Sequence, residues 1–415
     1  MAPEENFRSH RLLVLTSRLV LMTWLLAGST VITPLMAGST DNSPVDQVAR
    51  LSPTEAGERI DVLRTEIAYH DELYFKKSAP VISDYAYDQL KRELAALEQA
   101  FPQATREGED VQPGIGDDRV DSFATYRHRV RMLSLNKSYT EAELRAFDAR
   151  LKKQLGQGEL DYVVEPKFDG LAISVTFEKG KLVRAVTRGN GAEGDDVTAN
   201  LLTIRTLPHS LRAMTPDGAA NSIPDVIELR GEVYLSFAEF NRINREREDA
   251  GEPPFAIPRN LAAGTLKQLD PVEVAKRKLE IVFYGVGVCE PTRARPDSQL
   301  ALLRQLHAWG LPTIEAPRPA RGADAMWRAV QTVGKERAKL GFPIDGAVVK
   351  LDAVALQDQL GVTTQAPLWA MAYKFAPEKV ETQIKAISLQ VGRTGVLIPV
   401  AELAPVKLLP SHDGR

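Results

Sequence analysis

The chain has few residues of the kinds that zinc sites, disulfide scaffolds and strongly basic proteins require. One of its 415 residues is a cysteine, Cys289, which excludes a disulfide framework and any zinc site made of several of its own thiolates. The six histidines contain no convincing pair at metal-ligand spacing. The formal net charge is −3, so a surface that binds nucleic acid would have to be local. We therefore expect no zinc and a reducing, cytoplasmic environment.

Residues 1–45, a leader, fit that environment poorly. The stretch 8–39 starts with basic residues, continues with an apolar run over 19–27 and ends in small residues, as secretory signals do. Arg18 interrupts the apolar run, and Pro34 lies in the part that would have to complete a membrane span. One interpretation is a signal or membrane anchor. The other, which we prefer, is a start codon assigned too far upstream, with Met36 as the true beginning.

Residues 46–121 predict a small helical domain. Ser52, Pro53 and Glu55 form the signature of a helix start with a capping box, and apolar residues follow at helical spacing. A second helix with a leucine-rich face is expected after Asp84. The polar stretch 106–122 contains glycine and proline and predicts a linker. The segment is therefore expected to be a helical hairpin followed by a domain boundary.

Residues 122–376 predict an α+β domain. Short β-branched runs bounded by turn residues indicate strands, and helices are expected over 236–251 and 297–310. Residues 377–415 contain two further strands joined by the turn at 393–395. Two strands do not make a stable domain alone, so this last segment either docks on its neighbour or is a cut fragment.

The stretch "EPKFDGLAIS", residues 165–174, places charges inside an apolar strand. Because side chains alternate along a strand, Glu165, Lys167 and Asp169 should share one face, with Val164 and Phe168 on the other. A lysine held in this way can act as a nucleophile once its ammonium group loses a proton. The ordinary alternative is a surface ion pair on an edge strand, and the short motif does not decide between the two.

Four other charged residues occur in similar apolar surroundings. Glu232 lies in the stretch "VIELRGEVYL", Lys350 in "IDGAVVKL" and Lys374 in "WAMAYKFAP". Arg188 lies next to a glycine-rich turn. Each could belong to an ordinary strand with a solvated face. Together they indicate a site for a polyphosphate, in which cations neutralise oxygens and a carboxylate helps to hold a divalent ion.

Eight blocks in a fixed order carry a resemblance to a known family. The blocks "EPKFDG", "TRGNG", "LRGEVYL", "PRNLAAGTLKQLDP", "FYGVGV", "IDGAVVK", "YKF" and "QVGRTG" resemble those of the bacterial NAD-dependent DNA ligases, from about residue 60 to about residue 406. The resemblance implies an α+β fold. It has a helical domain that binds nicotinamide mononucleotide (NMN), an adenylation domain of antiparallel sheets with helices, and a partial OB-fold. The adenylation domain would be a nucleotidyltransferase of the ATP-grasp-like DNA ligase/capping superfamily.

The resemblance also implies roles for single residues. Lys167 would attack the α-phosphorus of NAD⁺, release NMN and carry AMP, which then passes to a DNA 5′-phosphate before a 3′-hydroxyl seals the nick. Glu232 would assist in binding the ribose and Mg²⁺ or Mn²⁺. The remaining NAD⁺ contacts would be Glu165 at the adenine, Asp169 and Arg188 at the ribose, Lys350 and Lys374 at the phosphate, and Tyr74, Asp84, Tyr87 and Asp88 at the nicotinamide half.

Two residues are implied to contact nicked double-stranded DNA, and the protein is expected to be a monomer. Arg259 matches the family pattern, whereas Lys267 stands where arginine is usual, which keeps the charge but loses the bidentate geometry. Phe75 also departs from the pattern, because histidine is expected after Tyr74. Phenylalanine could stack on the nicotinamide nucleotide but lacks the ring nitrogens with which histidine would form a hydrogen bond to it.

Alternative functions stay open at this point. The chain could be another lysine nucleotidyltransferase such as an RNA ligase, or a relic that only binds nucleotide or DNA. The zinc finger, helix-hairpin-helix repeats and BRCT domain typical of the family do not follow the partial OB-fold. We therefore expect self-adenylation but poor sealing of nicks, in a replicative or a repair role.

Overall fold

A computed structural model describes residues 51–73, 81–82, 84–104, 117–120, 122–214, 220, 222–376, 381–391 and 397–404. The leader at 1–45, with its two interpretations, and the residues Tyr74 and Phe75 lie outside this described part. Within it, no helix is both long and apolar enough to cross a membrane. The export and anchoring interpretations of the leader therefore stay predictions.

The first described element is the predicted helical hairpin. It consists of helices α2 (Pro53–Asp71) and α3 (Asp84–Ala100), followed by a short 3-10 turn, η2 (Pro102–Ala104). The capping box is confirmed, since the Ser52 hydroxyl accepts from the Glu55 backbone N–H and the Ser52 N–H donates to the Glu55 carboxylate. The facing apolar side chains form a small core of their own: Ala56, Ile60, Leu63, Ile67, Leu94 and Leu97.

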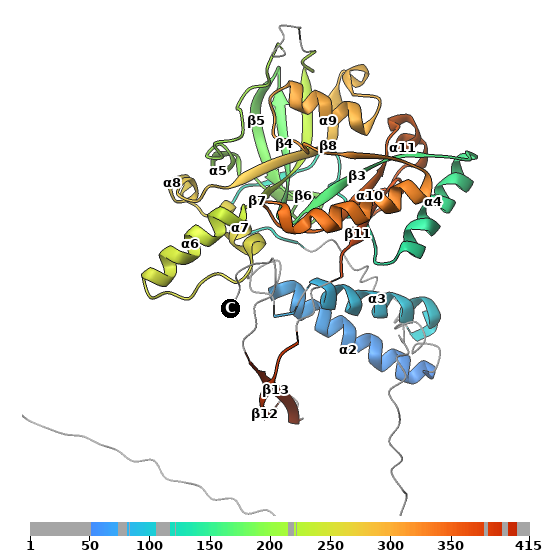
Figure 1. The fold of residues 1–415 in the computed structure, drawn as a ribbon, viewed down its shortest axis with the longest axis vertical. Coiled ribbons are helices and arrows are strands. Elements are labelled where there is room, and N and C mark those ends of the chain that lie inside the picture. The colour runs from blue at the N-terminus through green and yellow to red at the C-terminus, as the bar shows by residue number, and fades with distance from the viewer. Residues whose placement is uncertain are drawn as a thin grey trace, which may run out of the picture. The chain divides into compact units, whose positions relative to one another are not determined.

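The next domain is built on two larger sheets (Figure 1). The five-stranded sheet has the order β2 (Asn136–Ser138), β11 (Ala370–Lys374), β10 (Ile344–Leu351), β3 (Asp161–Phe168) and β9 (Arg318–Arg321). The four-stranded sheet has the order β5 (Lys181–Thr187), β4 (Leu171–Glu178), β7 (Val226–Tyr234) and β8 (Glu280–Glu290). A two-stranded sheet joins β1 (Thr125–Arg127) to β6 (Glu193–Asp195). The expected antiparallel pairing is confirmed except at one edge, where β2 pairs with β11 in parallel.

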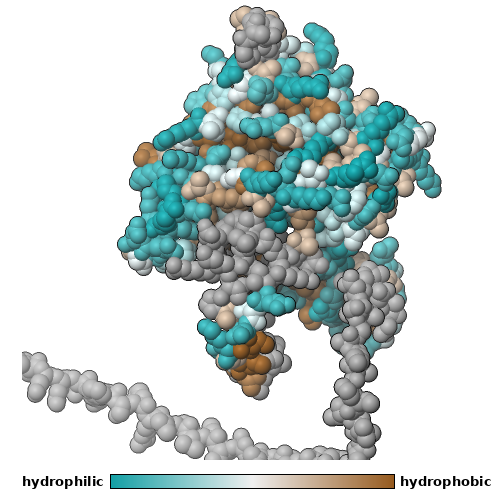
Figure 2. Space-filling model, in the orientation of Figure 1, coloured by the Kyte–Doolittle hydropathy of each residue, from teal (hydrophilic) through white to brown (hydrophobic). Residues whose placement is uncertain are grey.

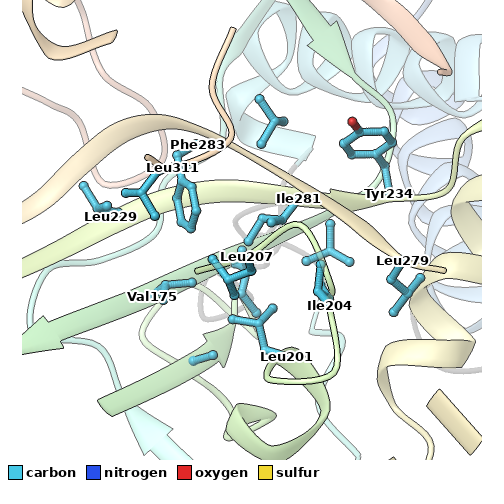
Figure 3. Packing of buried hydrophobic residues seen from close by; sticks show 14 of the residues in the cluster. Val175, Leu201, Ile204, Leu207, Leu229, Tyr234, Leu279, Ile281, Phe283 and Leu311 are labelled. Atoms are coloured by element: carbon cyan, nitrogen blue, oxygen red, sulfur yellow. The ribbon is translucent and has the colours of Figure 1, made fainter. Parts of the chain in front are cut away.

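Helices on the sheets enclose two hydrophobic cores. Helices α4 (Glu141–Leu155) and α10 (Gly322–Glu336) pack on one face of the five-stranded sheet, and Leu144, Val330 and Val349 lie between them. The second core belongs to the four-stranded sheet, where residues such as Val175, Leu229 and Phe283 pack together (Figure 3). The further helices are α5 (Thr198–Leu201), α6 (Phe237–Asp249), α7 (Pro258–Leu266), α8 (Pro271–Ala275), α9 (Gln299–Ala308) and α11 (Val354–Leu360), with 3-10 turns η3 (Thr292–Ala294) and η4 (Arg337–Lys339).

Strand β3 divides its side chains as the sequence predicts, with one exception. Val164 points into the core under α4 and α10, while Glu165 and Lys167 face the other way and line a cavity. Phe168 was expected beside Val164, but it packs in the core of the four-stranded sheet and stacks on Phe342 with 4.3 Å between ring centroids. The pairing register of β10 with β3 shifts between residues 344 and 346, and this bulge redirects the end of the strand.

The two C-terminal strands form the predicted hairpin. β12 (Ile384–Val391) pairs with β13 (Leu397–Leu403) in antiparallel register. Apolar side chains on it are exposed, with Ile384, Ile387 and Leu389 each more than 60% accessible. Figure 2 shows a brown, hydrophobic area where this hairpin lies. An isolated two-stranded hairpin is marginal in water. The hairpin is consistent with the predicted OB-fold segment, whose identity stays a prediction.

Candidate active site

One cavity of about 840 Å³ gathers most of the residues that the sequence singled out. Its wall comes from β3, β4, β7, β8, β10 and β11 together with α3 and α7. The predicted residues that line it are Tyr87, Asp88, Glu165, Lys167, Arg188, Glu232, Arg259, Lys267, Lys350 and Lys374. Residues separated by almost 300 positions in the chain are therefore brought to one place, as a nucleotide site requires.

Lys167 shares a carboxylate with Lys374. Its Nζ lies 3.0 Å from Oδ2 of Asp345, and Nζ of Lys374 lies 2.6 Å from the same oxygen. The three residues come from adjacent strands, because Gly346 of β10 is opposite Lys167 of β3 on one side and Lys374 of β11 on the other. Burial alone would raise the pKa of Asp345, but the charges of Lys167 and Lys374 hold that pKa well below its usual range.

Asp345 is the residue of this cluster that the sequence reasoning missed. It lies in the bulge of β10, so its side chain escapes the alternation from which the strand faces were predicted. One pattern in the sequence could have identified Asp345, because Asp345 and Gly346 repeat the Asp-Gly pair that follows Lys167 in the nucleophile motif. Its second oxygen, Oδ1, is buried and has no hydrogen-bond partner among the described residues.

Glu165 is buried and accepts hydrogen bonds at both oxygens. Lys350 Nζ donates to Oε2 at 2.7 Å, and Gln299 Nε2 donates to Oε1 at 2.7 Å. Both donors also reach the backbone carbonyl of Tyr284, at 2.8 Å and 3.0 Å. Glu165 and Lys350 were predicted, whereas Gln299 was not, because a lone glutamine at the start of a helix carries no distinctive pattern.

Glu232 of β7 lies near the cluster around Lys167. Burial raises the pKa of Glu232 to about 7, although Lys167 and Arg259 oppose the shift. Gly170 in the turn after β3 lies close to this part of β7: a Cβ on it would be 3.0 Å from Glu232 Cγ and 2.2 Å from the Val233 carbonyl oxygen, so only glycine fits there. A carboxylate that titrates near neutrality in a cavity is a candidate functional group.

Asp169 and Arg188 occupy the turns around the cavity. Asp169 does not line it directly, but its Oδ1 accepts from Arg259 Nη1 at 3.0 Å, and Arg259 does line the cavity. Arg188 follows β5, and its carbonyl oxygen lies 3.2 Å from Nε2 of His128. Gly189 after it has φ 57° and its Cα lies so close to the Glu193 carbonyl that a Cβ would be 1.8 Å from the oxygen.

The helical hairpin contributes Tyr87 and Asp88 to the cavity wall. Asp88 is buried, accepts from the hydroxyl of Tyr139 at 2.8 Å and pairs with Lys137 Nζ. Burial and the charge of Asp88 raise the pKa of Tyr139, so this hydroxyl stays a donor. The helix predicted after Asp84 is present and begins at Asp84 itself, but the Asp84 side chain, like Tyr74, lies outside the described residues.

Lys267 is held inside the protein by two buried carboxylates. Its Nζ lies 3.5 Å from Oδ1 of Asp118 and 3.5 Å from Oδ2 of Asp195, and it also donates to the Asp118 backbone carbonyl. Asp118 belongs to the stretch predicted as a linker, so at least residues 117–120 of that stretch pack against the adjoining domain. The predicted DNA contact of Lys267 stays untested, and its present partners are internal.

A divalent cation would find one predicted ligand in this cavity. Among the described residues, no group of three or more His, Cys, Asp or Glu side chains is arranged to hold a metal. Mg²⁺ in nucleotide sites is commonly bound through one or two carboxylates plus phosphate oxygens and water. Glu232, ionisable near neutral pH and facing the cavity, fits that pattern.

Comparison with known proteins agrees with this geometry. Residues 53–108 match the family described as DNA ligase-like, N-terminal NAD⁺-binding domain, and residues 120–378 match the NAD-dependent DNA ligase adenylation domain. Similar proteins include DNA ligase 1 and DNA ligase 2 of Opitutus terrae, at 57% and 52% identity, and a DNA ligase of Desulforudis audaxviator at 44%. The three matches cover 88% of this chain and 53%, 51% and 53% of the relatives, so the chain spans about half the length of the curated relatives it matches. The chain therefore belongs to the NAD-dependent DNA ligase family.

Proposed function

We propose that this chain transfers AMP from NAD⁺ to its own Lys167, the first step of NAD-dependent DNA ligation. The observation that supports it is the position of the Lys167 amine. It lines a nucleotide-sized cavity, and Asp345 orients it beside Lys374. The neutral amine attacks the α-phosphorus and loses a proton to solvent as the N–P bond forms, and the bond from that phosphorus to the bridging oxygen breaks. NMN leaves with the electron pair of the broken bond.

The residues around Lys167 supply positioning and charge. Phosphoryl transfer depends mostly on alignment and on neutralising the phosphate oxygens. Lys374 is the cation beside the nucleophile and is assigned to the phosphate. Asp169 and Arg188 are assigned to the ribose. Glu232 would hold a divalent cation, which when bound supplies charge neutralisation at the phosphates.

The two ends of NAD⁺ are assigned to different parts of the cavity. Glu165 is assigned to the adenine end. Lys350, which the family resemblance assigned to the phosphate, is reassigned to the adenine end, because its buried ammonium group donates to Glu165. Tyr87 and Asp88 of the helical hairpin, with Tyr74 and Asp84, are assigned to the nicotinamide end. These assignments follow from the family relationship and from the residues that line the cavity.

The later steps of DNA ligation are a further part of the proposal. AMP passes from Lys167 to the 5′-phosphate of nicked DNA, and the 3′-hydroxyl then displaces AMP and seals the nick. Arg259 and Lys267 are the candidates for contacts with DNA. We further propose that residues 46–121 form the NMN-binding domain, that residues 122–376 form an adenylation domain of the nucleotidyltransferase superfamily, and that the β12–β13 hairpin belongs to an OB-fold segment. The protein is proposed to be a cytoplasmic monomer that uses Mg²⁺ or Mn²⁺.

Intact-mass spectrometry of the 415-residue chain tests the first step. The protein is incubated with Mg²⁺ and either NAD⁺ or ATP, and the release of NMN is measured in parallel. We expect the mass of one AMP to be gained with NAD⁺ only. Lys167→Ala and Lys167→Arg should abolish the gain, whereas Lys153→Ala, an exposed lysine on α4, should not change it. An adduct formed from ATP, or one that persists without Lys167, would refute the proposal.

A further inference from the structure

The feature that carries a further inference is the double anchorage of Glu165. Its side chain is among the most buried charged groups in the described structure, at 1% exposure, and each of its oxygens already has one donor. Lys350 supplies one donor and Gln299 the other. Lys350 and Glu165 lie on neighbouring strands, whereas Gln299 comes from helix α9 and has no role in the proposed function so far.

The donor capacity of the Gln299 side-chain amide nitrogen is used up by this arrangement. A side-chain amide nitrogen has two N–H groups. One of them donates to Glu165 Oε1 at 2.7 Å and the other to the Tyr284 carbonyl oxygen at 3.0 Å. The amide nitrogen therefore has no N–H left for a ligand. Gln299 holds Glu165 in one orientation instead of binding the substrate through that nitrogen.

Glu165 and Lys350 keep free capacity for a ligand. Each carboxylate oxygen has two lone pairs and uses one of them here. The Lys350 ammonium group has three N–H groups and donates two, to Glu165 and to the Tyr284 carbonyl. Both residues line the cavity, so together they offer a ligand acceptor oxygens next to an ammonium donor.

That pattern fits a purine with an amino group at position 6. The amino group of adenine donates to the carboxylate, and N1 accepts from the ammonium group. Hypoxanthine presents the opposite pattern, a carbonyl at position 6 and an N1–H. A rigid acceptor–donor pair rejects such an analogue because buried polar groups would face like partners. The rejection depends on Glu165 being unable to rotate.

Helix α9 fixes Gln299 itself. The Gln299 backbone N–H donates to the Asp352 carbonyl oxygen at 2.8 Å, and Leu300 N–H donates to the Asp352 carboxylate at 3.0 Å. Ser298 caps the helix by accepting from Ala301 N–H at 3.1 Å. The start of the helix is thus attached to the end of β10, which also carries Lys350.

We propose that Gln299 is a positioning residue that sets the selectivity of the adenylation site for adenine. It does so by locking Glu165 between itself and Lys350. The inference rests on the proposed self-adenylation by NAD⁺ and adds the residue that determines which base is accepted.

The test compares NAD⁺ with nicotinamide hypoxanthine dinucleotide, which differs only in the base. The rate of AMP or IMP attachment to Lys167 is measured by intact mass for the wild-type chain and for Gln299→Met, which keeps the size but has no N–H donor. Gln305→Met is the matched control: it is the same change on the same helix, at a position that does not line the cavity. Gln299→Asn is a second variant, whose shorter amide does not reach Glu165, and thermal melting checks that each variant folds.

We expect the wild type and Gln305→Met to prefer NAD⁺ strongly and to the same degree. Gln299→Met and Gln299→Asn should lose about tenfold or more of that preference, the effect of removing one hydrogen bond to a buried charge. Equal slowing with both dinucleotides, with the preference unchanged, would show a purely structural role and overturn the inference. If the wild type gains no AMP from NAD⁺ at all, it is the proposed function that fails, and the two results are distinct.

Discussion

Replacing Asp345 by asparagine should be the most damaging conservative change in the site. Asp345 Oδ2 is the partner of two ammonium groups, at 3.0 Å and 2.6 Å, and the three side chains are 10–22% exposed. Asparagine keeps the shape but removes the negative charge that Lys167 and Lys374 share, so the repulsion between the two ammonium groups would no longer be offset at that oxygen. Removing one partner from a buried ion pair costs about 3–5 kcal/mol. Because the amide oxygen still accepts a hydrogen bond, we expect about 3 kcal/mol less free energy of unfolding at neutral pH.

The same substitution should slow adenylation by about 100-fold, since small displacements of a nucleophile have effects of that size. Urea unfolding followed by tryptophan fluorescence measures the stability, and intact mass with NAD⁺ and Mg²⁺ measures the rate. Asp324→Asn is the control: it makes the same chemical change in an exposed carboxylate paired with Arg145, and neither quantity should change appreciably.

The stability difference between the wild type and Asp345→Asn should depend on pH, in a direction set by the shifted pKa of Asp345. The pKa of Asp345 is lowered in the folded protein, so its stabilising effect is complete above the pKa of an unfolded aspartate, about 3.9. The effect is lost as pH falls below that value towards the folded pKa. The difference in stability between wild type and Asp345→Asn should therefore be constant from pH 5 to 7 and shrink below about pH 4. A variant as stable and as active as the wild type at pH 7 would contradict the assignment of Asp345 as the residue that holds the two lysines.

Two further predictions concern groups whose environment is unusual. Burial raises the pKa of Glu232 to about 7, so below that pH its carboxyl group is protonated in the free protein and cannot bind a cation. In the wild type, the Mg²⁺ concentration needed for half-maximal adenylation should therefore rise as the pH is lowered from 8 to 6. In Glu232→Gln it should stay constant over the same range. A pH-independent Mg²⁺ requirement in the wild type would argue against Glu232 as a ligand. Lys267→Ala leaves Asp118 and Asp195 buried without their cation and should lower the free energy of unfolding by about 3 kcal/mol, measured in urea, whereas Lys267→Arg should retain most of the stability. A stable Lys267→Ala variant would show that the internal ion pairs contribute little.

Much of this site was predictable because its residues lie on regular strands. The two-residue period of β3 placed Glu165 and Lys167 on the face opposite Val164, and the structure shows that division. The helix start at Ser52 was equally predictable, since a capping box is a local pattern of residues. In both cases the information lies within a few neighbouring residues, so no knowledge of the tertiary fold was needed.

Asp345 and Gln299 could not be placed in that way, and the reason is the same for both. Asp345 sits in a bulge, where one extra residue cancels the alternation that predicts which way a side chain points. Gln299 reaches Glu165 across 134 positions, from the first turn of a helix whose location depends on contacts with the end of β10. Local patterns singled out charged groups that line the cavity. The groups that orient them come from irregular positions and distant elements, because holding a charged side chain in one direction takes donors and acceptors from several parts of the fold. The expected effects of Asp345→Asn and Gln299→Met follow from this division: the first should disturb the nucleophile, and the second the choice of base, although neither residue is assigned a bond to the reacting atoms.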